Sequence, residues 1–402
     1  MKNNYKIILE FFESKPGAEI SKVQKKVLNQ VNKSNERDEI REIMQIISLI
    51  SDNHHRGLDL ISRTEQIISY INEKIKKNFT NQEIFEIFKK NKRILYYLFK
   101  IKTIIPDDYI LHYIYKRSGK YFINLDGEEE EEYEEEEERP DKLKIENNCR
   151  FNYDIYFYPQ IKNFITKEKK RQIENKISKL YPNALNDFEK KQENGENPNI
   201  LCEMIRSDSI ENFVAYVNEN SISLKATIKQ SVFETNSFLI MNNKQSLIEY
   251  AAFYGSIQIF QFLLFNKVEL KPSLWLYSIH GKNAELIHLL EENQVPPPDN
   301  SFKICLKKAI KCHHNDISNY IKSNLIKDDD DLFDSEYYFK ENIASYSFHY
   351  HNYCFYQNKL DDYHTFLYLC QYNYVYLVKF YLNHKNIDVN KKLIYTICFY
   401  EI

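Results

Sequence analysis

Hydrophobic residues recur at a spacing of three and four through the first third of the chain. Isoleucine and methionine side chains between positions 40 and 50 fall on one face of a helix, and isoleucines between 61 and 75 fall on one face of the next. This spacing is typical of amphipathic helices that pack against a core. The pattern therefore predicts two helices before residue 80.

Two further helices follow in the same region. Thr80 and Glu83 have the spacing of a capping box, in which the Thr side chain accepts a bond from a free backbone N–H and the Glu reaches back. A third helix is predicted from there through Leu98. Pro106 interrupts the pattern, and a fourth helix is predicted through Tyr115.

A different pattern begins near residue 200. The segment 246–264, SLIEYAAFYGSIQIFQFLL, matches the ankyrin signature, which has paired Ala, then Gly, then a helix ending in Leu-Leu. Ala251-Ala252 and Leu263-Leu264 stand where two antiparallel helices must approach closely. The segment therefore predicts a pair of packed helices.

The same frame recurs along the C-terminal half. It fits one earlier segment, 200–217, which an inserted loop at 218–245 separates from 246–264. It also fits three later segments, 273–290, 304–321 and 364–382. One further, degenerate pair of helices fits between 337 and 355. Trp275 takes a buried position in this frame and is predicted to lie in the core. The offsets of 27 and 31 residues between successive starts at 246, 273 and 304 are shorter than the standard repeat of about 33. We therefore expect five or six units in which several β-turn fingers are short or missing.

The chain resembles the lineage-expanded ankyrin-like proteins of parasitic protists, which carry a domain of unknown function ahead of their repeats. The residues that carry the resemblance are SLIEYAAFYGSIQIFQFLL, LWLYSIHGKNAELIHLLEEN and KCHHNDISNYI, with NKRILYYLFKIKTI and FYPQIKNFI upstream. The resemblance covers most of residues 80–402. It implies an all-α protein with an N-terminal helical module followed by a degenerate ankyrin-type solenoid of helix pairs, and it implies no chemistry.

Charge and composition set the domain boundaries. With 402 residues, 43% hydrophobic and 28% charged, the chain has the composition of a folded globular protein of at least two units. Asp126 and ten Glu between 128 and 138 form an acidic segment without an apolar face, which is typical of a solvated linker. We therefore expect a helical domain, an acidic linker, a helical connector and a repeat domain at 1–125, 126–142, 143–199 and 200–402.

Cysteine usage and hydropathy indicate the compartment. Seven Cys without a pairing pattern favour free thiols in a reducing compartment. No segment approaches the run of about 18 apolar residues that crosses a bilayer. We expect a cytoplasmic protein, with a nuclear one as the alternative, and no membrane partner.

In an ankyrin-like stack, the first helix of each pair faces a concave groove. Its exposed positions flank the paired small residues, and an aromatic or basic surface there suits a protein partner. The alternative is that these are ordinary surface residues. In this frame the candidate partner-binding residues are Tyr250, Phe253, Tyr277, His280, Lys308, Lys311, Tyr368 and Gln371.

The sequence offers no pattern for catalysis or for a cofactor. It has no Gly-rich phosphate loop, no Gly-x-Ser-x-Gly and no His-Glu-x-x-His. Side chains that are adjacent in sequence rarely all reach one metal ion. We therefore expect structural roles, and no metal site, for Cys312-His313-His314 and for the cluster of His349, His351 and Cys354. His54-His55 reads as a solvated turn. We expect neither catalytic nor metal-binding residues and no cofactor.

The sequence thus predicts a scaffold or adaptor that binds another protein. One alternative is nucleic-acid binding through Lys-rich helices such as 167–179, although we do not expect nucleic acid to be the partner. Another is a structural protein that assembles with itself. The choice of partner would lie in the groove and the inserted loops, because a fold alone does not specify function.

Overall fold

The structure is a computed structural model that describes residues 2–14, 18–33, 37–56, 59–118, 152–180, 187–242, 244–326, 343, 346–354, 366, 369, 370, 374, 378 and 382. The predicted acidic linker at 126–142 lies outside these residues. So does most of the predicted helix pair at 364–382.

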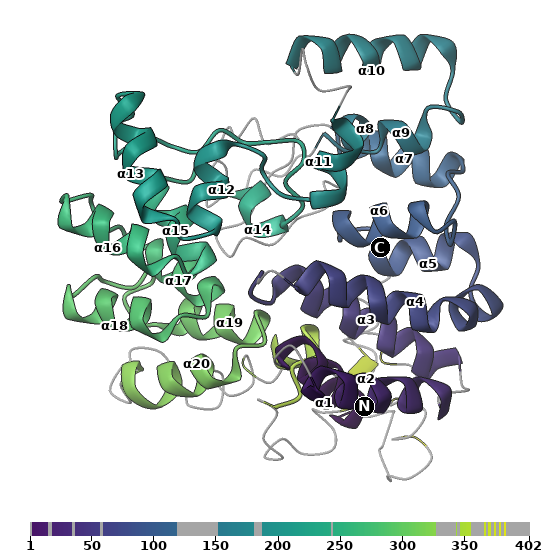
Figure 1. The fold of residues 1–402 in the computed structure, drawn as a ribbon. Helices are drawn as coiled ribbons and strands as arrows, with labels where there is room; N and C mark the ends of the chain where they lie inside the picture. Colours follow the sequence, from purple (N-terminus) through teal and green to yellow (C-terminus); the bar gives the residue numbers. More distant parts are fainter. Residues whose placement is uncertain are drawn as a thin grey trace, which may run out of the picture. The chain divides into compact units, whose positions relative to one another are not determined.

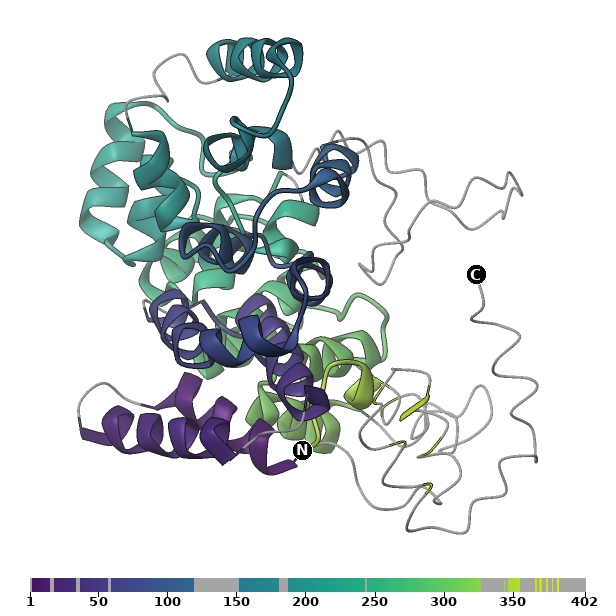
Figure 2. The ribbon, with the colours of Figure 1, turned by 90° about the vertical axis from the view of Figure 1, so that its right-hand side faces the viewer.

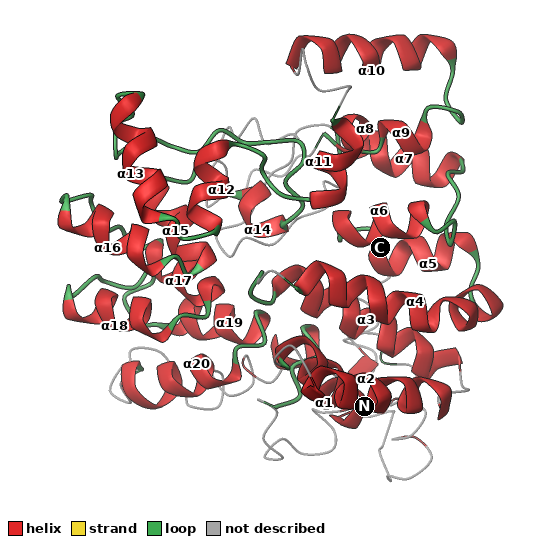
Figure 3. Ribbon diagram, in the orientation of Figure 1, coloured by secondary structure: helices red, strands yellow, loops and turns green. Residues whose placement is uncertain are grey.

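The described part of the chain is all-α, as predicted from the sequence. It forms the helices α1–α20 and one π-helix, η1 (Figures 1 and 3). Among these residues β pairing is limited to one isolated antiparallel bridge between Thr227 and Ser246. None of the described helices combines the length and the hydropathy that a bilayer span requires.

One compact unit comprises Met1–His54, Gln66–Lys74 and Asp299–Ile402. In it α1 packs against α2 and α3, and α1 and α2 lie side by side in both views (Figures 1 and 2). Farther along the chain, α19 packs on α20 and on η1. The helices of this unit are α1 (Lys2–Glu13), α2 (Ala18–Lys33), α3 (Arg37–Asn53), α19 (Lys303–Lys311), α20 (Asn315–Tyr320) and η1 (Ile321–Leu325).

The second compact unit comprises His55–Glu65 and Ile75–Pro298, so that α4 (Leu60–Asn78) contributes to both units. Neither unit coincides with one of the domains expected from composition. The helices of this unit between α4 and the inserted loop are α5 (Asn81–Phe88), α6 (Lys92–Lys100), α7 (Asp108–Lys116), α8 (Tyr153–Tyr156), α9 (Tyr158–Ile161), α10 (Lys167–Leu180), α11 (Phe188–Asn194), α12 (Ile200–Arg206) and α13 (Ile210–Glu219). Those that follow are α14 (Ser237–Met241), α15 (Leu247–Tyr254), α16 (Ile257–Phe265), α17 (Leu274–Gly281) and α18 (Ala284–Glu292).

The predicted third helix is divided into two in the structure. The capping box between Thr80 and Glu83 is present at the start of α5. The chain then leaves the helix after Phe88, and the side chain of Asn91 caps α6 by accepting a bond from the backbone N–H of Ile94 at 3.0 Å. The prediction of one continuous helix from Thr80 through Leu98 was therefore wrong, because Asn91 is the N-cap of a second helix.

The segments 200–217, 246–264, 273–290 and 304–321 are all pairs of helices joined by short turns: α12 with α13, α15 with α16, α17 with α18, and α19 with α20. The turns share one conformation. A single residue adopts the left-handed region, with φ of 47° at Asp208, 70° at Gly255, 48° at Lys282 and 59° at His313. The next residue is then the N-cap of the second helix.

Neighbouring pairs in the second unit are joined at these turns. The Ser256 hydroxyl donates to the carbonyl oxygen of Ile205 at 2.5 Å, and the Asn283 amide donates to the carbonyl oxygen of Gly255 at 3.2 Å. Both donors are N-caps of second helices, and both acceptors belong to the preceding pair. From one helix pair to the next, α12 packs against α15, α15 packs against α17, and α13 packs against α16 (Figure 1).

Small residues allow α15 and α17 to approach closely. Ala251, Ala252 and Ser278 are fully buried, as the repeat frame predicted. A Cβ atom on Gly281 would lie only 2.2 Å from the carbonyl oxygen of Ala252. Since that oxygen belongs to the backbone, Gly281 is required for this helix contact.

Candidate functional site

The residues predicted to line an exposed groove in the second unit are buried. Tyr250, Phe253 and His280 are each 1% exposed, and Tyr277 is 4% exposed. The predicted exposure of these four residues was therefore wrong. As the structure has them, they cannot contact a partner protein directly.

The inserted loop between α13 and α15 fills the position of the predicted groove. Phe238 in α14 stacks on Phe253 with ring centroids 6.0 Å apart, and its ring meets those of Tyr277 and His280 at 4.9 and 4.4 Å. Aromatic pairs at these distances are stabilising contacts of a packed interior. The chain therefore covers the face of α15 and α17 with its own residues.

Tyr250 is held by a polar contact at the same face. Its hydroxyl accepts a bond from Nη1 of Arg206 at 3.1 Å, and Nε of Arg206 lies 2.9 Å from the Glu196 carboxylate. Burial raises the pKa of Tyr250 well above its usual value. Tyr250 thus remains a neutral hydroxyl with a defined partner.

The remaining candidate residues belong to the first unit. Lys308 and Lys311 are half-buried, and the Lys311 ammonium lies 4.8 Å from the centroid of the Tyr350 ring. Burial lowers the pKa of Lys308, and the charge of Lys311 lowers it further. Tyr368 and Gln371 lie outside the described residues.

The inserted loop is anchored by two buried cations that the sequence analysis did not single out. Nη1 of Arg56 donates to the Glu234 carboxylate at 3.0 Å, and Nη2 donates to the Thr235 hydroxyl at 2.7 Å. The ammonium of Lys92 donates to the carbonyl oxygens of Val232 and Glu234 at 2.6 and 3.0 Å. Buried charges of this kind are stable only when they are paired or hydrogen-bonded.

Glu234 also organises the backbone of the loop. The same carboxylate oxygen that pairs with Arg56 accepts the backbone N–H groups of Thr235 and Asn236 at 2.9 and 2.8 Å. A carboxylate that binds two successive N–H groups fixes a turn in the chain. The turn then leads into α14, which carries Phe238.

The backbone of Gly195 also binds Arg56 and Thr235. Its carbonyl oxygen accepts from Arg56 at 3.1 Å and from the Thr235 hydroxyl at 2.6 Å. Gly195 has φ of 68°, and a Cβ atom there would lie 2.9 Å from Cδ of Arg93. Both the backbone conformation and the close approach of Arg93 favour glycine at this position.

Lys92 is enclosed by aromatic rings as well as carbonyl groups. Its ammonium lies 4.2 Å from the centroid of the Tyr156 ring and 5.7 Å from that of Tyr153. Burial lowers the pKa of Lys92 to about 7, an effect that the Glu234 carboxylate opposes and the Arg117 charge reinforces. The cation–π contact and the two hydrogen bonds compensate part of the desolvation.

The turn that contains His54 and His55 differs from the prediction. His54 is 5% exposed, so the predicted solvated turn was wrong at this residue, and His55 is half-buried. The His54 ring packs edge-on against His314 at 4.9 Å, and its Nε2 lies 3.3 Å from the Glu13 carboxylate. The polar residues next to His54 in the sequence give no signal of these distant contacts.

Comparison of the chain with protein-family models, with curated proteins and with solved structures found no match. The resemblance to ankyrin-like proteins rests on the residues alone.

No three His, Cys, Asp or Glu side chains converge as metal ligands in the part of the chain that the structure describes. Cys312, His313 and His314 are all buried. His351 is buried as well, whereas His349 and Cys354 are exposed. The members of the second cluster therefore differ in exposure.

The Lys-rich helix α10 uses part of its charge within the fold. Ile173 and Ile177 form its buried face. The ammonium of Lys176 pairs with the Asp154 carboxylate at 2.8 Å, and that of Lys169 lies 4.5 Å from the Tyr115 ring centroid. These two lysines are therefore engaged by the protein itself, which reduces the charge available to a nucleic acid.

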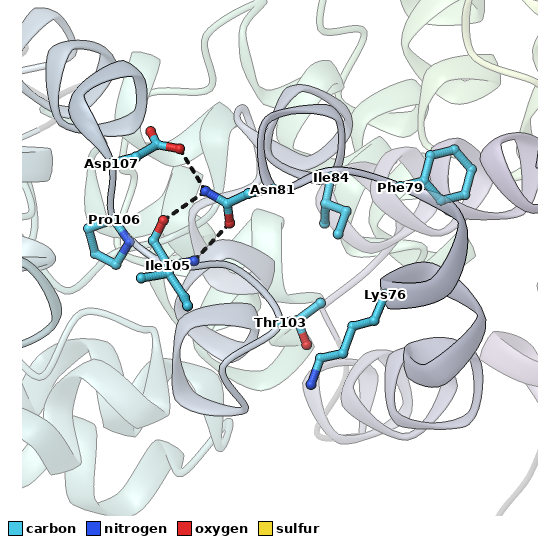
Figure 4. Close-up of a pocket in the computed structure, with 8 residues that line it drawn as sticks. All are labelled: Lys76, Phe79, Asn81, Ile84, Thr103, Ile105, Pro106 and Asp107. Carbon is cyan, nitrogen blue, oxygen red and sulfur yellow. Dashed lines mark hydrogen bonds between the residues drawn. The ribbon is translucent and has the colours of Figure 1, made fainter.

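A surface pocket of about 360 Å³ lies where α4 ends and α5 begins (Figure 4). The Asn81 amide donates to the Ile105 carbonyl oxygen at 2.9 Å and to the Asp107 carboxylate at 2.7 Å, and its oxygen accepts the Ile105 N–H. These bonds hold the loop that forms one wall. The pocket is lined by Lys76, Phe79, Asn81, Ile84, Thr103, Ile105, Pro106 and Asp107.

Proposed function

We propose that the chain is a scaffold that binds another protein through a stack of ankyrin-like helix pairs, and that it works by binding rather than by catalysis. The observation that carries the proposal is the shared turn geometry. Asp208, Gly255 and Lys282 take the same left-handed conformation between the helices of three successive pairs. Hairpins that repeat in conformation and pack on their neighbours are typical of repeat proteins, which commonly present binding surfaces.

The ends of the second helices support the same reading. Asn220, Asn266 and Asn293 follow α13, α16 and α18, and each is followed by a residue in the left-handed region. The backbone N–H groups of Ile222, Val268 and Val295 then return to the last turn of these helices. A backbone that recurs in this detail at both ends of the second helices supports a repeated unit.

The binding surface is proposed on the second helices rather than on the first. The face of α15 and α17 is covered by Phe238 in α14, whereas α13, α16 and α18 lie along the other side of the pairs (Figure 1). Phe265, at the end of α16, is 86% exposed. Exposed aromatic side chains on a rigid helix are favoured as interface anchors.

An affinity capture with matched variants tests this proposal. The full-length protein, Phe265→Ser and Phe164→Ser are each used to capture proteins from an extract of the cells that produce the chain. Phe164 is 49% exposed in the loop between α9 and α10, so it controls for the loss of an exposed aromatic ring. We expect one set of proteins with the wild type and Phe164→Ser, and its loss with Phe265→Ser. The same set with all three proteins would refute the assignment of the surface.

A further inference from the structure

A buried polar cluster in the first unit joins α1 to two turns that are distant in sequence. The Tyr5 hydroxyl donates to Oδ1 of Asn352 at 3.0 Å and lies 3.2 Å from Nδ1 of His313. The amide of Asn315 also approaches this hydroxyl at 3.4 Å. Tyr5, His313 and Asn352 are all fully buried.

The hydrogen bonds fix which nitrogen of His313 carries a proton. The Asn352 amide group donates to the backbone carbonyl oxygen of Ile310 and to Oδ1 of Asn315, both at 2.9 Å. Its own Oδ1 must therefore accept the single hydroxyl proton of Tyr5. The Tyr5 oxygen can then only accept from His313, so Nδ1 of His313 bears the hydrogen.

This tautomer leaves Nε2 of His313 as a bare acceptor. Nε2 is buried and has no hydrogen-bond partner among the described residues. Protonation of this nitrogen would place a charge and an unmatched donor in the interior, which is costly. The neutral ring is compatible with the cluster, and the imidazolium is not.

Other titratable groups surround the cluster. His54 faces His313 from the position directly after α3, and Glu13 faces it from α1. His351 faces it from the turn that holds Asn352, and Cys354 faces Tyr5. Burial lowers the pKa of His313 well below 6.5, and the two neighbouring histidines reinforce this shift. Glu42 faces Tyr353, and burial raises its pKa to about 7, so Glu42 favours the folded state as the pH falls and opposes the histidines.

We propose that Tyr5, His313 and Asn352 form an acid-sensitive latch, which holds α1 on the turn between α19 and α20 at neutral pH and releases it at mildly acidic pH. The latch is a regulatory device in the first unit and does not depend on the proposed protein-binding function. Histidine is suited to this role because its unperturbed pKa lies just below neutrality.

The sign of the pH effect follows from the histidine. When α1 opens, His313 regains its ordinary pKa near 6.5, whereas in the closed state it stays neutral to a much lower pH. The open state therefore binds the extra proton, and opening becomes easier as the pH falls below about 6.5. At pH 5.5 this linkage favours opening about tenfold for one histidine.

Hydrogen exchange measured by mass spectrometry on the full-length protein tests the latch. Protection of α1 is compared at pH 7.5 and 5.5 after correction for the intrinsic exchange rate. Because Glu42 and the other histidines titrate in every variant, the contribution of His313 is the difference between the wild type and His313→Asn, and we expect protection to fall about tenfold more in the wild type. His313→Asn keeps an N–H donor for Tyr5, tolerates the left-handed backbone at this position and does not titrate, so it lacks only the contribution of His313.

Two further variants complete the test. His349→Asn changes an exposed histidine on the same segment as Asn352 and is expected to keep the full pH response. Tyr5→Phe removes the shared hydroxyl and is expected to lower α1 protection already at pH 7.5. Equal pH responses in the wild type and His313→Asn would overturn the proposal, as would unchanged α1 protection in Tyr5→Phe.

Discussion

At the scale of single residues, Ser278 carries a hydroxyl group into the contact between α15 and α17. Its side chain is fully buried, and Oγ finds no hydrogen-bond partner among the described residues. Ser278→Ala is therefore expected to raise the free energy of unfolding by about 1 kcal/mol, because an unsatisfied polar group is removed without loss of a bond. Urea denaturation measures this change through the fluorescence of Trp275, the single tryptophan, in the same helix.

A neighbouring serine provides the control. The Ser273 hydroxyl donates to the Glu249 carboxylate at 2.7 Å, so Ser273→Ala removes a bond and is expected to lower stability by about 1 kcal/mol. A loss of stability in Ser278→Ala as large as that in Ser273→Ala would show that the Ser278 hydroxyl has a partner.

The repeat frame predicted correctly which small and large side chains are buried in the core. It did not predict correctly which side chains of the first helices are exposed. Trp275 is 1% exposed and donates to the Val295 carbonyl oxygen at 2.9 Å, which confirms its predicted place in the core. Tyr250 and Phe253 occupy positions that a regular repeat would expose. Their burial depends on Phe238 in the inserted loop, and local periodicity carries no information on where such a loop packs.

At the scale of elements, Lys92 links α6 to the inserted loop and gives this link a pH dependence. The pKa of Lys92 is about 7 in the fold, against 10.5 for the ordinary side chain. Between these values the unfolded chain holds more protons than the folded one, so stability rises with pH in this window. Lys92 is therefore expected to contribute about 1 to 2 kcal/mol to the rise in the free energy of unfolding from pH 7 to 8.5, and Lys92→Met is expected to lose this contribution.

The measurement is again urea denaturation followed at Trp275, at the two pH values. Lys90→Met is the control, because Lys90 is exposed and lies two positions away. It is expected to keep the pH dependence of the wild type. The role assigned to Lys92 would be wrong if Lys92→Met showed the same rise in stability as Lys90→Met.

Helix positions were more predictable than helix ends and connections. The capping box at Thr80 was readable because both of its members are close in sequence, and it is present. The break between α5 and α6 depends on Asn91, whose signal as an N-cap lies inside an apparently continuous apolar pattern. The anchors of the inserted loop could not be read at all, because Arg56 and Lys92 are far from Glu234 in sequence.

At the scale of the whole molecule, composition did not show how the chain divides. The first unit combines residues 1–54 with residues after 298, and the second combines α5–α13 with the helix pairs α15–α18. Contacts between distant segments decide such a division, and neither charge runs nor repeats report them. The all-α class was predictable because each helix carries its own periodicity.

We propose that a protein partner binds on the side of α13, α16 and α18. Cross-linking with an amine-reactive reagent, followed by mass spectrometry of the captured complex, measures this most directly. Lys267 and Lys271 are exposed in the loop between α16 and α17, whereas Lys162 is exposed directly after α9 and Lys179 is exposed within α10. We expect cross-links from the partner to Lys267 and Lys271. Cross-links confined to Lys162, Lys179 and their neighbours would contradict it.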